Sequence, residues 1–144
     1  MKFQLLGALA LLSSVAVAHA APCGYCHKPI VGTPYVLKNA KHSEQFKCAY
    51  CAVADASGAD DWKGDVTMIA PSENAKKPVT LKRVGGKWKQ FPASAVFTEA
   101  SPIRHSKCGE QYRAFTTKAA AQKYIKTGAA DKVISLAELV RKAS

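Results

Sequence analysis

Two C-x-x-C motifs, CGYC at 23–26 and CAYC at 48–51, constrain this chain more than any other feature of its sequence. They hold four of its five cysteines, and 21 residues separate them. Two such pairs at this spacing match the ligand set of a closed tetrahedral Cys₄ zinc site. The sequence therefore predicts a fold in which two separate segments close around one metal ion.

The same motifs allow two other chemistries. The string CGYCH at 23–27 is a complete haem attachment signal, in which Cys23 and Cys26 would form thioethers and His27 would be the axial ligand. A c-type haem electron carrier is therefore an alternative, although the strand-rich body of the chain argues against a cytochrome. Disulfides within or between the pairs are the other alternative, and they would make this a stapled interaction domain.

Residues 1–20 have the pattern of a secretory signal peptide. One lysine is followed by an apolar run from Leu5 to Ala18 and by a small-x-small end that predicts cleavage after Ala20. No second long apolar run follows, so we expect an exported protein, periplasmic or secreted, that does not span the membrane. In an oxidising compartment each cysteine has to be paired, metallated or reactive.

The chain is basic, with 21 Lys and Arg against 10 Asp and Glu, and removal of Lys2 with the signal peptide would leave a net charge of about +10. Its lysines are scattered, and no arginine-rich run or stacking-aromatic motif accompanies them, so we expect no nucleic-acid partner. A solvated basic surface is the simplest interpretation. An acidic partner or an anionic membrane surface is the alternative.

Residues 21–144 suffice for one domain with a hydrophobic core, and we expect a small single domain of the α+β class. Strands are predicted at 34–39, 44–47, 65–70, 79–91 (a hairpin around Gly85-Gly86), 94–100 and 132–136, and helices at 48–56, 116–128 and 136–144. The order of elements around Phe46 is echoed around Phe115. Two diverged β-β-α-β units, in halves 21–72 and 78–144, would account for this echo.

Outside the two motifs, His105 and Cys108 are close enough in sequence to bind one ion, and Cys108 is the odd thiol. A buried cysteine beside a surface histidine is the alternative. We interpret His42, in a polar turn, as a surface residue. We interpret four aromatic residues as core or core-edge: Trp62, Trp88, Phe91 and Phe97. The sequence has no paired carboxylates, no Ser–His–Asp order and no phosphate loop, so we expect no enzymatic activity.

The order of these features resembles the NosL-like family, the copper-binding accessory proteins of nitrous oxide reductase. The resemblance rests on CGYC, on FKCAYC at a helix start, on the strand DVTMIA, and on SAVFTEAS, YRAFTTKAAAQKYI and KVISLAEL towards the end. It implies a fold of two β-β-α-β units and a copper(I) site that includes Cys23 and Cys26. Where the family continues with glycine and methionine, this chain has His27 and Lys28, and Met68 is the methionine left in the mature chain.

We therefore expect an exported metal-binding protein, a copper(I) or zinc carrier or metallochaperone, and not an enzyme. The first-choice ligands are Cys23, Cys26, Cys48 and Cys51, and the second choices are His27, His105, Cys108 and Met68. The thiols would lose protons on capturing the ion and pass it on by ligand exchange. We expect the recipient to be an exported metalloenzyme. An open coordination position would suit such transfer, whereas a closed Cys₄ site would suit a structural role.

Overall fold

The structure, a computed structural model, describes residues 20–100 and 112–144. Most of the predicted signal peptide, residues 1–19, lies outside these described residues, as do His105 and Cys108. None of the described helices combines the length and hydrophobicity that a transmembrane span requires.

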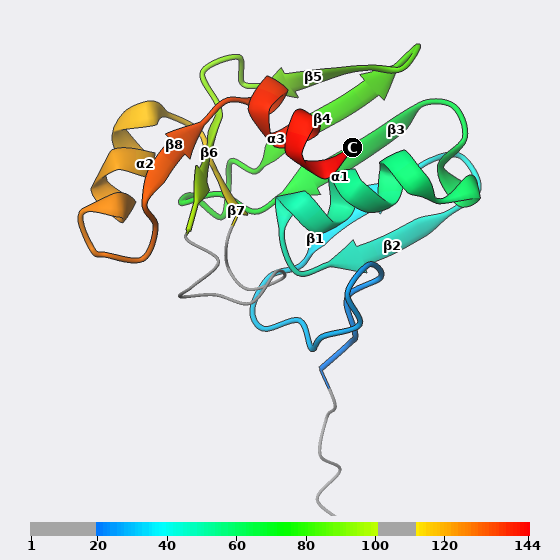
Figure 1. Cartoon of the computed structure of the whole chain (residues 1–144), viewed down its shortest axis with the longest axis horizontal. Coiled ribbons are helices and arrows are strands. Elements are labelled where there is room, and N and C mark those ends of the chain that lie inside the picture. The colour runs from blue at the N-terminus through cyan, green and yellow to red at the C-terminus, as the bar shows by residue number, and fades with distance from the viewer. Residues whose placement is uncertain (1–19, 101–111) are drawn as a thin grey trace, which may run out of the picture.

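The described residues form an α+β fold, as predicted, with two antiparallel sheets and three α-helices (Figure 1). The elements are β1 (Tyr35–Lys38), β2 (Ser43–Phe46), α1 (Ala49–Gly58), a 3₁₀ turn η1 (Asp60–Trp62), β3 (Val66–Ala70), β4 (Val79–Val84), β5 (Lys87–Phe91), β6 (Val96–Glu99), β7 (Tyr112–Phe115), α2 (Lys118–Ile125), β8 (Lys132–Ile134) and α3 (Leu136–Ala143). The first sheet has the strand order β2-β1-β3-β4-β5 and the second has the order β7-β6-β8.

The two β-β-α-β units predicted from the sequence are present in this topology. β1, β2, α1 and β3 form the first unit, and β6, β7, α2 and β8 form the second. In each unit the first strand lies in the middle and pairs antiparallel with the other two. The β4–β5 hairpin extends the first sheet only, although the expected second half, 78–144, begins with it.

Local sequence signals account for most of the boundaries. The two-residue turn of the β4–β5 hairpin has positive φ angles at Gly85 and Gly86, 55° and 77°, which is the type I′ geometry that favours glycine. Between the predicted helix at 48–56 and the predicted strand at 65–70, α1 continues to Gly58 and η1 follows it.

α1 is the central element of the core. It packs against β1, β2 and β3 on one side and against β7 and α3 on the other, and Figure 1 shows it lying across the first sheet beside α3. Alanine suits this position because it lets packed elements approach closely. The buried residues of α1 are Ala49, Cys51, Ala52, Val53, Ala54 and Ala56. One hydrophobic cluster joins α1 to residues of both sheets, including Leu37 and Phe97.

The aromatic residues divide into two groups. Trp62 and Phe97 are fully buried and Trp88 is half-buried, in agreement with the prediction. The prediction for Phe91 is wrong, since 51% of this residue is exposed. Phe91 ends the edge strand β5 and pairs with Thr80, which alternates with the buried Val79 and Leu81 of β4. It therefore lies on the face of the sheet opposite α1.

Candidate metal centre

Three cysteines from the two C-x-x-C motifs converge in the structure. The Sγ atoms of Cys23, Cys26 and Cys51 all lie within 4.8 Å of one another. Cys23 and Cys51 are completely buried and Cys26 is half-buried. The four described cysteines are present as thiols. The fold therefore joins the first motif to the second, and we call these three residues the cysteine trio.

Cys23 and Cys26 lie in a loop that precedes the first sheet, residues 21–30, which we call the N-terminal loop. Its two ends pair with each other: Pro22 and Pro29 form an isolated antiparallel bridge, and the Ile30 N–H donates to the Ala21 carbonyl at 2.9 Å. At its tip, the His27 N–H donates to the Cys23 carbonyl at 2.8 Å. This tight turn holds both thiols of the motif on one short segment.

The N-terminal loop docks on the end of β2, just before α1 (Figure 1). The Gly24 N–H donates to the Gln45 carbonyl at 3.0 Å, and the Lys47 N–H donates to the Cys23 Sγ at 3.3 Å. A Cβ atom at Gly24 would lie 2.4 Å from the Glu44 carboxylate, so glycine leaves room for that side chain. The bond from the Lys47 N–H ties the Cys23 sulfur to the residues just before α1.

His27 follows the first motif directly and has an unusual backbone. Its φ is 58°, and it is the residue other than glycine with a positive φ among those described. Its side chain is exposed, and it is not part of the cysteine trio. Glycine is the residue that adopts such a left-handed backbone without steric cost.

Cys48 occupies the N-cap position of α1, with φ −152° and ψ 168°. It makes no side-chain capping hydrogen bond. The equivalent N-cap of α2 is Thr117, whose Oγ1 accepts a hydrogen bond from the Ala120 N–H at 3.2 Å. The first unit thus has a thiol where the second unit has a capping hydroxyl.

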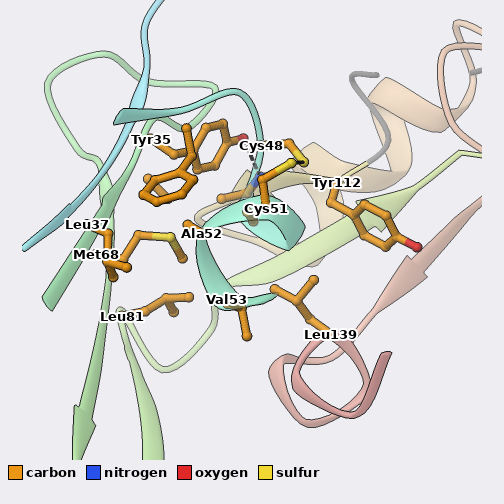
Figure 2. Close-up of a cluster of buried hydrophobic side chains, with 14 of the residues drawn as sticks. Tyr35, Leu37, Cys48, Cys51, Ala52, Val53, Met68, Leu81, Tyr112 and Leu139 are labelled. Atoms are coloured by element: carbon orange, nitrogen blue, oxygen red, sulfur yellow. Dashed lines mark hydrogen bonds between the residues drawn. The ribbon is translucent and has the colours of Figure 1, made fainter. Parts of the chain in front are cut away.

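Cys48 lies outside the trio but touches it. Its Sγ is 3.6 Å from the Cys51 Sγ, and Figure 2 shows the two thiols side by side at the start of α1. The hydrogen bond with Cys51 lowers the pKa of Cys48, although burial opposes this. The first amide N–H groups of α1 and the nearby Lys47 lower it further. A cation and hydrogen-bond donors near the sulfur are the surroundings that lower the pKa of a cysteine.

Tyrosines surround the cysteines, and the sequence alone did not predict their place in the site. Tyr25 and Tyr50, the third residues of the two motifs, pack edge to face with ring centroids 6.3 Å apart. Tyr50 stacks on Tyr112 at 5.1 Å. The shared pattern C-x-Y-C was the available signal. Tyr35 lies beside Cys48, and its hydroxyl accepts a hydrogen bond from the Ala114 N–H at 3.4 Å.

The two tyrosines with shifted pKa values both lie in this shell. Burial, and then the charge of Cys48, raises the pKa of Tyr35, while burial and the neighbouring Glu99 raise the pKa of Tyr112 to about 12. Both side chains therefore stay neutral at neutral pH. Their rings and hydroxyls line the site of the cysteines without adding a charge to it.

The other predicted ligands have different positions. Met68 is completely buried on β3, and Figure 2 shows it between Leu37, Leu81 and Ala52 in the hydrophobic core. The structure does not bring His27 into the trio, and Met68 is a member of the hydrophobic core cluster. His105 and Cys108 lie outside the described residues. Sequence spacing identified the cysteines that meet, but it did not separate Cys48 from the other three.

Comparison with solved structures places this fold among known ones. Six chains match, and one of them is described as the "Crystal structure of the mercury-bound form of MerB2". The match has a TM-score of 0.61 at 14% identity and covers 83% of this chain. This chain spans 63% of the length of that MerB2 chain. At this level of identity the likeness shows a shared fold.

Comparison with sequences gives no match. No protein-family model matches the chain, and no curated protein matches it. The resemblance to NosL-like proteins therefore has no support from these comparisons.

The structural match corrects the expectation that this chain is not an enzyme. MerB is an enzyme, an organomercurial lyase, so proteins with this fold can carry catalysis. The lack of paired carboxylates, a Ser–His–Asp order and a phosphate loop excluded common hydrolytic and phosphoryl-transfer sites. It did not exclude chemistry carried out by buried thiols, which is the kind of group this site contains.

Proposed function

We propose that this chain binds a soft metal ion, copper(I) or zinc, through the cysteine trio, with Cys48 as a fourth ligand. The observation that carries the proposal is the convergence of Cys23, Cys26 and Cys51, three thiols from two separate segments, within 4.8 Å of one another. Soft thiolate ligands select ions of this kind. The mercury-bound state of the matching MerB2 structure is consistent with a soft-metal site on this fold.

The sulfur positions suit an ion with little rearrangement. With metal–sulfur bonds of about 2.3 Å, neighbouring sulfurs lie about 3.8 Å apart around a tetrahedral ion and about 4.0 Å apart around a trigonal one. The Cys48–Cys51 separation of 3.6 Å and the 4.8 Å limit of the trio are both close to these values. Three-coordinate copper(I) would use the trio alone, whereas four-coordinate zinc would also recruit Cys48.

A carrier role follows from the uneven exposure of the ligands. Cys26 is half-buried, whereas Cys23 and Cys51 are completely buried, so an incoming ligand would reach the ion first from the Cys26 side. Thiolates of a recipient could then replace the bound sulfurs one at a time. We propose an exported, periplasmic metalloenzyme as that recipient, in keeping with the predicted signal peptide.

Serine substitutions at the two cysteines of α1 test the proposal. Cys51 is within reach of the other three sulfurs, so Cys51→Ser should lower the affinity for both metals by about 100-fold or more. Cys48→Ser should lower the zinc affinity strongly and the copper(I) affinity much less. Ala54→Ser, a buried serine elsewhere on α1, is the matched control.

The measurement is competition with chromophoric chelators on the reduced protein. Affinity in Cys51→Ser equal to that of the Ala54→Ser control would contradict a site built on the trio. The intact mass of the denatured protein separates the alternatives, because covalent haem adds its mass to the chain and each disulfide lowers the mass by two hydrogen atoms. Either mass in the purified protein would replace the metal-carrier proposal.

A catalytic role is the second candidate, and the fold shared with MerB2 is the observation that favours it. Glu44 lies against Gly24, so a carboxylate borders the N-terminal loop that carries two of the thiols. Incubation with a phenylmercury salt tests this candidate. Release of benzene that is lost in Cys51→Ser would support it, and a phenylmercury adduct that stays intact would contradict it.

A further inference from the structure

The face of the first sheet that lies opposite α1, which we call the outer face, carries two contrasting rows of side chains. Residues paired across antiparallel strands lie on the same face, so the strand register gives the order of each row. The first row, which we call the lysine row, consists of Lys38, Thr67, Lys82 and Lys89. The second row lies two residues further along each strand and consists of Val36, Ile69, Thr80 and Phe91.

The outer face is open to solvent. The three lysines of the lysine row are exposed, while 51% of Phe91 and 53% of Val84 are exposed. Val84 pairs with the exposed Lys87 at the end of the β4–β5 hairpin and extends this surface. Figure 1 shows α1 across the other face of the sheet. The outer face therefore combines exposed cations with exposed apolar side chains.

A hollow of about 560 Å³ lies between the strands' side chains on this surface. Lys38, Thr67 and Lys82 are among the residues that line it. Asp65 lies at its rim, where its carboxylate accepts a hydrogen bond from the Gly85 N–H at 3.2 Å. The hollow thus offers a small anionic group two ammonium groups and a hydroxyl.

The positive charge of the outer face is not neutralised within it. None of the residues that β1 to β5 place on this face is acidic. No ion pair between described residues includes the lysines of this face, Lys38, Lys82, Lys87 and Lys89. Lys82 and Lys89 lie directly opposite each other, and like charges in that position destabilise a sheet. A negatively charged partner would relieve this repulsion.

The mixture of side chains favours a lipid surface over an acidic protein. The Lys82 Nζ lies 5.8 Å from the centre of the Phe91 ring, so charge and ring present themselves together. An apolar ring can enter the boundary between headgroups and acyl chains while neighbouring ammonium groups stay at the phosphates. Arginine, whose planar fork matches a carboxylate with two hydrogen bonds, is absent from the outer face of the described strands.

We propose that the outer face of the first sheet binds the surface of a bilayer containing anionic phospholipids. The lysine row lies against the lipid phosphates, and Phe91 reaches the edge of the acyl region. Cys51 lies on α1, across the sheet from this surface, so membrane binding does not use the residues of the trio. The inference goes beyond the proposed metal binding and does not depend on it.

Cosedimentation with vesicles tests the inference on the reduced, metal-free protein in its exported form. The N-terminus is checked by intact mass, because a retained apolar run at 5–18 would bind neutral vesicles as well. The protein should bind vesicles made of equal parts phosphatidylcholine and phosphatidylglycerol at least about tenfold more tightly than pure phosphatidylcholine. This preference should shrink as the salt concentration rises.

Glutamine substitutions locate the effect. Lys82→Gln with Lys89→Gln should weaken binding to the anionic vesicles by about tenfold or more, and the fold should tolerate the change because it removes a like-charge pair. Lys123→Gln with Lys126→Gln is the matched control, since it removes two exposed charges at the end of α2 and should leave binding within about twofold. Phe91→Ala should weaken binding in a way that added salt does not mask.

Three results would overturn the inference. The first is equal binding of the wild type to neutral and anionic vesicles, and the second is an equal loss of binding in the Lys123/Lys126 control. The third is binding to soluble polyglutamate, lost in the Lys82/Lys89 variant, without binding to anionic vesicles, which would identify the outer face as a site for an acidic protein. Metal affinity measured on the same variants should be unchanged, so failure of the metal proposal would be seen separately.

Discussion

At the scale of single residues, His27 has a backbone conformation that residues other than glycine disfavour. A left-handed conformation costs an L-residue roughly 1–2 kcal/mol relative to a right-handed one, and glycine avoids this cost. His27 adopts it at φ 58° in the turn between Cys26 and the end of the N-terminal loop. Such an outlier raises the question of whether the imidazole contributes to the site.

Replacing His27 separates these effects. His27→Gly should raise the free energy of unfolding of the metal-free protein by about 1 kcal/mol, because it removes the backbone strain. His27→Ala keeps the strain and removes the imidazole, so it should give no such gain. Urea denaturation of the reduced protein measures both. Copper(I) affinity should be unchanged in both variants, and a loss in both would place His27 among the ligands.

At the scale of elements, the start of α1 illustrates a trade between stability and binding. The two units have equivalent strand–helix junctions, but Thr117 caps α2 with a hydrogen bond and Cys48 gives α1 none. An N-cap hydrogen bond contributes about 1 kcal/mol. With cysteine at position 48, the start of α1 therefore lacks this stabilising hydrogen bond, at the point where the Cys48 and Cys51 sulfurs meet.

Exchanging the cap residue tests this interpretation. Cys48→Ser should stabilise the metal-free protein by about 1 kcal/mol, because a serine hydroxyl can accept from an amide N–H of the first turn. Thr117→Ala should destabilise it by a similar amount. Thermal unfolding of both variants under reducing conditions gives the comparison. A lower stability of Cys48→Ser would show that thiol packing outweighs the cap.

The carboxylate of Glu73 connects the segment between β3 and β4 to the residues just before α2. Glu73 accepts hydrogen bonds from the Thr116 backbone N–H at 3.0 Å and from the Thr116 Oγ1, just before α2. Partial desolvation tends to raise the pKa of Glu73, but the two hydrogen bonds from Thr116 lower it overall. A carboxyl whose pKa is lowered on folding stabilises the fold at neutral pH, and this contribution disappears on acidification.

Glu73→Gln should therefore reduce stability at pH 7 by less than about 1 kcal/mol, since the group is largely exposed. The difference from the wild type should shrink as the pH falls below about 4.3, the ordinary glutamate value, and through the lower folded pKa. Urea unfolding between pH 3 and 7 measures it. Asp60→Asn, at an exposed carboxylate, is the control. A difference that stays constant with pH would rule out this linkage.

At the scale of the whole molecule, the two units share one core around α1. Trp62 lies in η1, just before β3, and Trp88 lies on β5, so both tryptophans are in the part of the molecule that contains the first sheet. Far-UV circular dichroism, in contrast, has contributions from the helices and strands of both units. Because α1 contacts elements of both units, we expect them to unfold together. Unfolding curves followed by tryptophan fluorescence and by circular dichroism should coincide. Separate midpoints would show two independently folding units.

Much of this architecture could be predicted from local signals. The Gly85-Gly86 turn predicted the hairpin, and the echo around Phe46 and Phe115 predicted the two units. The exposure of Phe91 could not be predicted in this way. It depends on which face of the first sheet the helices cover, and that is decided by tertiary packing.

The candidate site was predictable in part. The motif spacing predicted that the two pairs of cysteines meet, but the helical rotation of α1 and the docking of the N-terminal loop decide that Cys51, and not Cys48, completes the trio. The expectation of no enzymatic activity is wrong because it relied on motifs of other reaction classes. The signal peptide, the copper or zinc preference and the ligands beyond the trio stay predictions.

The docking of the N-terminal loop has a consequence for chain entropy. Its contacts with the rest of the fold include the Gly24 N–H bond to Gln45 and the Lys47 N–H bond to Cys23. An ion shared by Cys26 and Cys51 would cross-link positions 25 residues apart. Closing a loop of this length lowers the entropy of the unfolded chain, which corresponds to a stabilisation of the fold by roughly 3.5 kcal/mol. The ion would thus serve as a reversible staple, present in the loaded protein and gone after delivery.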